Sequence, residues 1–208
     1  MTYEVETRFR FDDVFQIWEE LPALTTLSWK TEYWHTEILG KSYFESGQLL
    51  RISEVASQNN QPKYYLGWKG VDVGGFANIR EELGEDITNG ISESVILANL
   101  GVIPNTHSTL QSVVSILEKE NFQRFLDFSG ENQVVGDNAF GFHFKIMKCK
   151  DIKYPVLMEI EKTATHQKEA KTFEAELYLF AQKNDLLHRV VRDEPPTLLY
   201  GAKLERSS

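Results

Sequence analysis

Near its start the chain reads Tyr3-Glu4-Val5-Glu6-Thr7-Arg8-Phe9-Arg10-Phe11. Every second residue from Tyr3 onward is apolar or threonine, and the residues between them are two glutamates followed by two arginines. Because side chains alternate between the two faces of a β-strand, this pattern predicts a strand with one buried face and one charged face. The charged face suits a divalent metal together with a polyphosphate, since such metals prefer carboxylate oxygens and phosphates bind fixed cations. An ordinary strand whose charged side is solvated fits this stretch as well.

The overall composition is that of a globular protein with an excess of acidic residues. Of 208 residues, 41% are hydrophobic, and 22 Lys and Arg stand against 31 Asp and Glu for a net charge of -9. This charge argues against nucleic acid or an acidic membrane surface as a partner, so any anionic ligand must be bound by a local set of cations. The sequence has no apolar run of membrane-spanning length and no secretory signal, and we expect a cytoplasmic protein. The single cysteine, Cys149, excludes an internal disulfide and a cysteine-based zinc site.

The order of the predicted elements favours an α+β fold. Turn residues and hydrophobic periodicity predict a helix at 14–21, strands at 28–39, 48–55, 63–70 and 76–87, helices at 92–100 and 109–120, strands at 122–128, 139–147 and 155–164, and a helix around 173–181. Strands that are grouped between helices, rather than alternating with them one for one, favour an antiparallel sheet. We expect a single domain over residues 1–208, with two strand-rich halves, at about 1–90 and 120–165, joined by helices.

A charged face recurs in the later strands. Alternation selects Glu82 rather than Glu81 as the partner of Arg80, and the residues expected on these charged faces are Arg51 with Ser53, Lys69, Arg80 with Glu82, His143 with Lys145, and Glu159 with Glu161. Paired carboxylates such as Glu159 and Glu161 repel each other unless a cation joins them. If the sheet curls into a closed or nearly closed barrel, these faces line its interior, where a metal and a polyphosphate would neutralise them. The alternative is a sheet whose mixed charges face water.

These segments resemble the motifs of the CYTH superfamily of triphosphate tunnel metalloenzymes. The segment from Glu4 to Arg10 is similar to the family's glutamate-x-glutamate-x-lysine-x-arginine hallmark, with arginine in the lysine position. Further segments follow in the family's order: Leu50-Arg51-Ile52, Leu66-Gly67-Trp68-Lys69-Gly70, Arg80-Glu81-Glu82, Leu157-Met158-Glu159-Ile160-Glu161 and Glu194-Pro195-Pro196-Thr197-Leu198-Leu199-Tyr200. The resemblance runs from Tyr3 to about Leu204 and is poorest between about 102 and 150.

The resemblance implies a closed eight-stranded antiparallel β-barrel, or tunnel, with helices packed outside. It also implies a triphosphate bound together with Mg2+ or Mn2+. The implied metal ligands are Glu4, Glu6, Glu82, Glu159 and Glu161, of which Glu4, Glu6 and Glu159 form the expected catalytic set. The expected phosphate-binding residues are Arg8, Arg10, Arg51, Lys69 and Arg80, together with Lys145 from the later charged face.

Several positions depart from the family pattern. Ser53 stands where many members have a second arginine, His35 stands where an aspartate is usual, and a later strand that often bears an aspartate has His143 and Lys145. We expect the two histidines to form hydrogen bonds or to face phosphate rather than bind metal, because neither has a second histidine at ligand spacing. Candidates for the basic motif that follows the family's central helix are Lys119 and Arg124.

Four functional hypotheses follow. The first is a metal-dependent hydrolase of tripolyphosphate, thiamine triphosphate or a nucleoside triphosphate, in which water attacks the terminal phosphorus in line. The second is a class IV adenylyl cyclase, in which the ribose 3'-hydroxyl displaces pyrophosphate to make cyclic AMP. The third is a non-catalytic polyphosphate-binding module, and the fourth is a barrel without a small-molecule site. We expect a small-molecule triphosphate as partner, neither nucleic acid nor membrane, and a monomer or homodimer.

Overall fold

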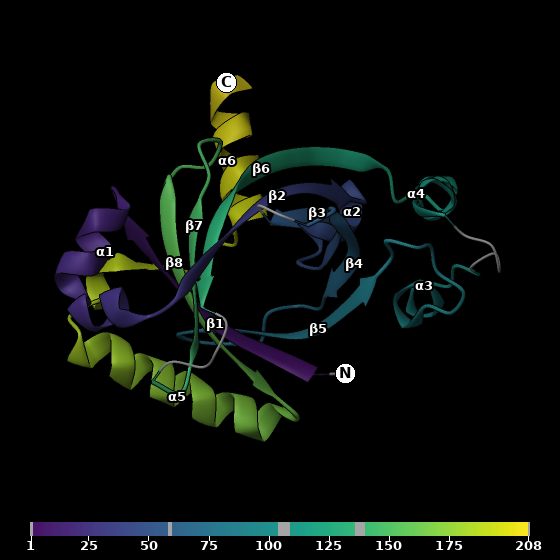
Figure 1. Ribbon diagram of the computed structural model, residues 1–208. Helices are drawn as coiled ribbons and strands as arrows, with labels where there is room; N and C mark the ends of the chain where they lie inside the picture. Colours follow the sequence, from purple (N-terminus) through teal and green to yellow (C-terminus); the bar gives the residue numbers. More distant parts are fainter. Residues whose placement is uncertain (1, 58–59, 104–108, 136–139, 208) are drawn as a thin grey trace.

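The computed structural model describes residues 2–57, 60–103, 109–135 and 140–207. Within these residues one antiparallel sheet has nine strands, which neighbour one another in the order β5 (Asn78–Asp86), β4 (Lys63–Lys69), β3 (Leu49–Ser57), β2 (Trp29–Leu39), β6 (Arg124–Val135), β7 (His143–Lys148), β8 (Val156–Ala164), β1 (Thr2–Phe11) and β9 (Val190–Val191). A further pairing of β5 with β1 closes the first eight into a ring, which is visible in Figure 1. The predicted closed eight-stranded antiparallel barrel is therefore confirmed.

Strand β1 decides where the barrel closes. It pairs with β8 along Tyr3–Phe11, whereas its other edge pairs with β5 only through Thr2–Glu6 and with β9 through Arg8 and Phe9. The two glutamates of β1 therefore lie in the closed ring. The C-terminal part of β1 has left β5 and is covered by the short strand β9 instead.

Helices lie around the ring rather than within it. They are α1 (Val14–Glu20), α2 (Lys41–Glu45), α3 (Val95–Asn99), α4 (Leu110–Lys119), α5 (Gln167–Lys183) and α6 (Pro195–Ser207), with short 3-10 turns η1 (Pro22–Thr26) and η2 (Leu187–Arg189). Figure 1 shows α1 and α5 on one side of the barrel and α3 and α4 on the opposite side. Side-chain caps begin several of them: the Asp13 carboxylate accepts from the Gln16 amide at 3.0 Å, and Ser94 and Thr109 cap α3 and α4. No described helix is long and apolar enough to cross a membrane.

Three apolar clusters hold these layers together. The first packs Val5, Phe9 and Phe11 of β1 against α1 and α5, and the second packs Leu50 and Ile52 of β3 against α3 and α4. Both are outer-face clusters, as the alternation predicted. The third joins Trp34, Phe128, Met147 and Leu157 to Leu198 and Leu199 of α6. Because several of these third-cluster residues come from the inner face, an apolar plug closes one part of the barrel interior.

The observed elements differ from the predicted ones at several places. Strand β6 continues to Val135, beyond the predicted end at 128. The polar sequence after residue 128 does not predict a strand, but β2 pairs with β6 from Trp29 to Leu39 and supplies the hydrogen bonds that extend it. The segment expected to be a turn after Gly40 contains α2, and the helix α6 was not predicted. Proline suits the first turn of a helix, where its missing N–H leaves no intrahelical bond unmade, so Pro195 and Pro196 begin α6 instead of breaking it. The strand expected at 139–147 begins at His143, and residue 139 lies outside the described residues.

Candidate functional site

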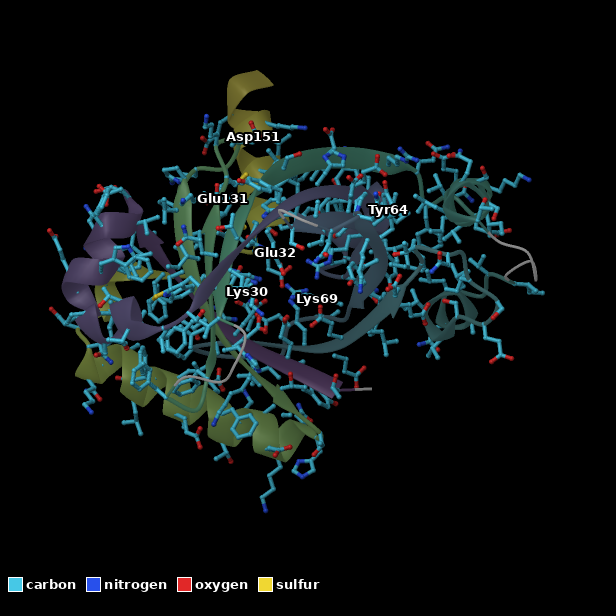
Figure 2. All side chains as sticks on the ribbon, viewed as in Figure 1. Lys30, Glu32, Tyr64, Lys69, Glu131 and Asp151 are labelled. Carbon is cyan, nitrogen blue, oxygen red and sulfur yellow. The ribbon has the colours of Figure 1, made fainter. Side chains whose placement is uncertain are left out.

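The barrel encloses a cavity of about 310 Å³. Lys69 lies inside the ring of strands in Figure 2, and the side chains around it come from most strands of the barrel. The charged lining residues are Glu4, Glu6, Arg8, Arg51, Lys69, Glu82, Lys145, Glu159 and Glu194. The uncharged lining includes Trp34, Thr36, Ser53, Val55, Tyr65, Phe128, Asn132 and Met147. Charge is therefore concentrated on the walls away from β2 and β6.

Three carboxylates converge beside β1. Glu4 and Glu6 of β1 and Glu161 of β8 each offer a ligand oxygen, and these atoms all lie within 4.8 Å of one another. Glu6 and Glu161 are direct cross-strand partners, a position in which like charges destabilise a sheet. Oxygen-only donor sets of this kind suit Mg2+ and Mn2+. The structure thus brings Glu161, rather than Glu159, to the two glutamates of the opening motif.

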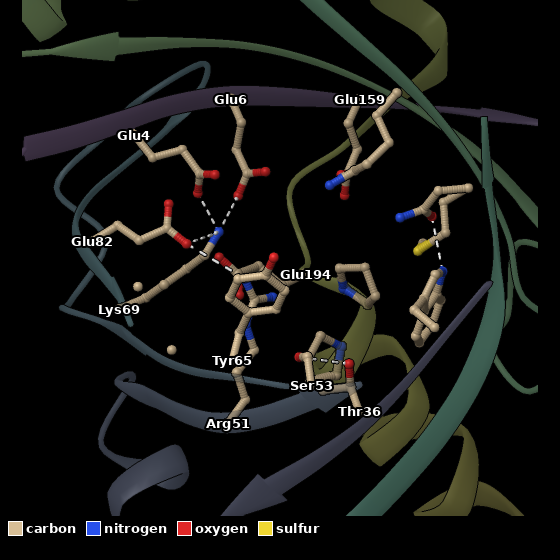
Figure 3. A pocket seen from close by; sticks show the side chains of 18 of the residues that line it. Glu4, Glu6, Thr36, Arg51, Ser53, Tyr65, Lys69, Glu82, Glu159 and Glu194 are labelled. Atoms are coloured by element: carbon tan, nitrogen blue, oxygen red, sulfur yellow. Dashed lines mark hydrogen bonds and ion pairs between the residues drawn. The ribbon is translucent and has the colours of Figure 1, made fainter. Parts of the chain in front are cut away.

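Lys69 supplies positive charge at the centre of this acidic group. Its buried ammonium contacts Glu4 and lies 3.2 Å from Glu6 and 3.9 Å from Glu82, as the dashed lines of Figure 3 show. Burial alone would lower the pKa of Lys69, but Glu4 and Glu6 raise it well above its usual value. The lysine is therefore protonated, and it points at the carboxylates from β4, which only β5 separates from β1 around the ring.

A second network surrounds Arg8, whose side chain is only 2% exposed. Its Nε donates to Glu159 at 2.8 Å and its Nη1 donates to the Asn78 side chain at 3.1 Å, while Nη2 contacts Glu6. Lys145 of β7 contacts the other oxygen of Glu159. Glu159 is therefore held between two cations, which leaves it less available to a metal than Glu161.

The carboxylates of the tunnel divide into two electrostatic groups. Burial by itself raises the pKa of every one, but Arg8 and Lys69 lower that of Glu6, and Lys145 and Arg8 lower that of Glu159. Burial and the Glu6 charge raise the pKa of Glu4 well above its usual value, and burial raises that of Glu161 although Lys145 opposes it. Glu4 and Glu161 thus lack sufficient positive charge nearby. A divalent cation at the Glu4, Glu6 and Glu161 oxygens would supply it, so the donor set fits the implied metal.

The remaining cations near the tunnel, Arg51 and Arg80, differ in how many of their donors are already bound by protein groups. Arg51 of β3 is 36% exposed and lies 3.4 Å from Glu82. Burial alone would raise the pKa of Glu82, but the charges of Lys69 and, to a smaller extent, Arg51 lower it. Arg80 lies 3.0 Å from Glu194 and donates to the carbonyls of Gly47 and Gly70 at 2.8 and 2.9 Å. Arg51 is consequently open to the cavity, whereas Arg80 is engaged with the loops at its edge.

Some of the residues expected in the tunnel lie elsewhere. Arg10 is exposed and donates to the Tyr154 hydroxyl at 3.3 Å outside the tunnel, because the apolar plug occupies the interior beyond Arg8. His35 lies on the outer face of β2, 2.9 Å from the Ser129 hydroxyl, since alternation turns Trp34 and Thr36 inward. Of the two roles expected for His35, the structure shows the hydrogen bond, and the side chain does not line the cavity.

Neither candidate for the basic motif reaches the cavity. Arg124 pairs with Glu37 at 2.6 Å and lies 3.7 Å from Glu118 on the outside of the barrel, and Lys119 is exposed at the end of α4. His143 stands opposite Glu161 in the pairing of β7 with β8. Ser53 lines the cavity, where its hydroxyl lies 2.9 Å from that of Thr36.

Two site residues were not identified from the sequence. Glu194 is 5% exposed and lies 3.0 Å from Arg80 and 3.8 Å from Arg8. The sequence shows its segment only as a motif. Glu194 stands directly before the two prolines that begin α6, and this position is the signal that could have identified it as a site residue. Asn78 accepts from Arg8 and donates to Asp72 at 2.8 Å. Alternation along β5 would have placed it with Arg80 and Glu82.

Similar folds occur among solved structures at low sequence identity. No family model and no curated protein matches the sequence. The PH1819 protein of Pyrococcus horikoshii OT3 matches at a TM-score of 0.72 and 15% identity, over 95% of this chain and 98% of that one. HpAC1 of Hippeastrum, described as an adenylyl cyclase candidate with a dominant triphosphatase activity, matches at 0.55 and 17%, over 89% of each chain. A chain of the Schizosaccharomyces pombe Mediator head module matches at 0.56 and 11%, over 86% of this chain and 93% of that one. These matches establish the tunnel fold.

Proposed function

We propose that this protein belongs to the CYTH superfamily and hydrolyses a triphosphate group with the help of Mg2+ or Mn2+. The observation that carries the proposal is the convergence of Glu4, Glu6 and Glu161 within 4.8 Å, beside the buried ammonium of Lys69. The fold shared with HpAC1, whose description includes a dominant triphosphatase activity, supports the same class of substrate. Tripolyphosphate, thiamine triphosphate and nucleoside triphosphates all carry the group that such a site would bind.

The charge balance of the tunnel supports a metal requirement. Carboxylates slightly outnumber cations in and beside the cavity: Glu4, Glu6, Glu82, Glu159, Glu161 and Glu194 stand against Arg8, Arg51, Lys69, Arg80 and Lys145. A triphosphate carries several negative charges, so this site would repel it without further positive charge. Bound at Glu4, Glu6 and Glu161, Mg2+ or Mn2+ would supply that charge, polarise phosphoryl oxygens and lower the pKa of a coordinated water.

The side chains of the chain itself would take three roles. Arg51, which is open to the cavity, and Lys69 would bind the phosphate oxygens as charge-assisted donors. Glu159 would position Arg8 and Lys145 so that their charges face the phosphates, instead of binding the metal itself. The apolar plug around Trp34 and Phe128 would keep bulk water away from one side of the site.

Two other functions fit parts of the same geometry. A class IV adenylyl cyclase would use the same acidic cluster while directing a ribose hydroxyl, instead of water, at phosphorus. A polyphosphate-binding module is favoured by one specific feature, the internal pairing of Glu6 and Glu159 with Arg8, Lys69 and Lys145, which compensates these carboxylates without a metal.

Phosphorus NMR distinguishes the three functions. The protein is incubated with tripolyphosphate, ATP and thiamine triphosphate in the presence of Mg2+ or Mn2+, with EDTA as control. We expect orthophosphate from at least one substrate, only with metal. Pyrophosphate together with cyclic AMP would identify the cyclase instead. Absence of turnover, combined with metal-independent binding of tripolyphosphate, would replace the hydrolase with the binding module.

A further inference from the structure

A second group of cations lies outside the tunnel, at the C-terminal end of β1. It surrounds a pocket of about 380 Å³ lined by Arg10, Phe11, Asp12, Lys153, Tyr154, Pro155, His188 and Arg189. These residues come from the end of β1 and the residue after it, the loop between β7 and β8, and η2. The chain as a whole carries a net charge of -9, so this concentration of positive charge runs against its average composition.

Of the three cations that line the pocket, Arg10 and Lys153 have no carboxylate that pairs with them among the described residues. Arg189 does have one, because its Nε donates to Glu20 at 2.9 Å and a second nitrogen contacts the other oxygen of the same carboxylate. Among the described residues, no ion pair joins Arg10, Lys153 or His188 to a carboxylate. Asp12 is the single acidic lining residue, and its carboxylate accepts from Gln16 at 3.2 Å without losing its charge, so Arg10 and Lys153 together still exceed it by one positive charge. The pocket therefore presents uncompensated positive charge.

Tyr154 holds two of the cations in place. The guanidinium carbon of Arg10 lies 5.3 Å from the centre of the tyrosine ring, and the ammonium of Lys153 lies 5.5 Å from the same centre. Such cation–π contacts, together with the hydrogen bond from Arg10 to the tyrosine hydroxyl, restrict the side chains before any ligand arrives. Because the ring is already engaged by cations, the pocket suits a bare phosphate group better than a stacked nucleobase.

The pocket is separate from the tunnel. Tyr154 packs against the apolar plug that contains Leu157, Val191 and Leu198, and no residue lines both the pocket and the cavity. Strand β9 covers β1 at Arg8 and Phe9, so the exposed Arg10 and the buried Arg8 face different spaces although they are two residues apart. A ligand at Arg10 would consequently not touch the acidic cluster of the tunnel.

We propose that the pocket formed by Arg10, Lys153 and His188 binds a small phosphate anion, orthophosphate or pyrophosphate, independently of the tunnel. The planar guanidinium offers two parallel donors to two phosphate oxygens, and the ammonium and imidazole provide further donors to the others. This site does not depend on the proposed hydrolase, because none of its residues lines the tunnel.

Acetylation of lysines, read by mass spectrometry, reports on this pocket directly. The intact protein is treated with an amine-acetylating reagent in EDTA, with orthophosphate, pyrophosphate or sodium chloride at matched ionic strength. Bound anion covers Lys153, so at an anion concentration of about twice Kd its acetylation should slow about threefold. Lys150, which is exposed in the same loop but does not line the pocket, is the internal control and should react at an unchanged rate.

Three variants complete the test. Arg10→Gln should abolish the protection of Lys153, whereas Lys150→Gln, which removes the same charge outside the pocket, should leave it intact. Arg51→Ala changes only the tunnel and should also leave it intact. Equal slowing of Lys150 and Lys153, or no slowing of either at millimolar anion, would overturn the proposal. Loss of protection in Arg51→Ala would overturn it too, since the effect would then come from the tunnel.

Discussion

Glu4 inside the barrel and Glu174 on a helix outside it are compensated in opposite ways. On the outer side, Glu174 of α5 accepts from the backbone amides of Gly75, Phe76 and Ala77 at 2.6, 2.8 and 3.1 Å. Although burial alone would raise its pKa, these bonds and Lys171 lower it. On the inner side, burial and a neighbouring glutamate raise the pKa of Glu4. Ionised Glu174 therefore stabilises the fold, whereas ionised Glu4 destabilises the empty tunnel.

This difference in pKa distinguishes a carboxylate that stabilises the fold, Glu174, from a carboxylate that is suited to binding a ligand, Glu4. The outer carboxylate fixes the loop between β4 and β5, whose stability needs nothing beyond the chain. The inner cluster lacks sufficient positive charge of its own. Proteins accept such local costs mainly at functional sites. The predictions below compare how removal of the charge at Glu159 and Glu4 inside the barrel, and at Glu174 outside it, changes the free energy of unfolding.

The largest expected effect on stability comes from Glu159→Gln. Arg8 and Lys145 would stay buried or partly buried without their carboxylate partner, and breaking such a pair costs about 3–5 kcal/mol. Urea unfolding in EDTA measures the change in the free energy of unfolding. Glu81→Gln is the control, because Glu81 only accepts from the Tyr3 hydroxyl at 2.9 Å in a partly exposed position. A Glu159→Gln protein as stable as the wild type would remove Glu159 from the set of paired carboxylates.

Glu4→Gln should have the opposite profile. Burial disfavours the ionised form of Glu4, and the Lys69 ammonium keeps Glu6 at 3.2 Å and Glu82 at 3.9 Å as partners, so the free energy of unfolding without metal should change little. Metal-dependent release of phosphate should fall by about 100-fold or more, because the variant loses one carboxylate of the proposed metal site. The stabilisation that Mg2+ or Mn2+ gives the wild type, about 2.7 kcal/mol at about 100 times Kd, should shrink as well. Full activity in this variant would exclude Glu4 from the metal site.

Arg51→Ala should weaken the binding of a triphosphate by about 1–3 kcal/mol, through loss of charge-assisted hydrogen bonds. Isothermal titration calorimetry with tripolyphosphate and metal measures the change. Arg124→Ala is the matched control on the outer face, where Arg124 pairs with Glu37 at 2.6 Å. If both variants lose affinity equally, the effect is one of overall charge rather than of contact inside the tunnel.

Alternation along single strands was sufficient to predict most of the inner face. The positions of Glu4, Glu6, Arg51, Lys69 and Glu82 follow from it because the period of two is a local property of every strand. The closed barrel itself followed from a family resemblance rather than from the local pattern. Local pattern also selected Glu82 over Glu81, and Glu81 does lie toward Tyr3.

The errors arose where tertiary packing decides what alternation cannot. Arg10 continues the charged face of β1, but the plug built from α6 and its neighbours fills the interior before the strand reaches it. The expectation for His35 left open whether it forms hydrogen bonds or faces phosphate, and only the pairing of β2 with β3 and β6, which turns Trp34 and Thr36 inward, leaves it hydrogen-bonded outside the cavity. The expected catalytic set contained Glu159 and not Glu161. Glu159 contacts Arg8 and Lys145, whereas Glu161 lies with Glu4 and Glu6, and these contacts cannot be read from alternation along single strands.

The smallest expected effect is on the outer face, at Glu174. Glu174→Gln keeps the shape of the side chain but removes its charge, and it should lower the free energy of unfolding by about 1 kcal/mol at about pH 7. The folded-state pKa of Glu174 lies below its ordinary value of 4.5, so its contribution is complete above that value and is lost as the pH falls through the folded-state pKa. Urea unfolding at about pH 7 and about pH 3 should therefore show a difference between wild type and variant that shrinks in acid. Glu176→Gln, on the same helix and paired with Lys162 at the surface, should change stability by less than about 0.5 kcal/mol at either pH. A difference at Glu174 that grows in acid would mean that this carboxylate, like Glu4, opposes folding when it is ionised.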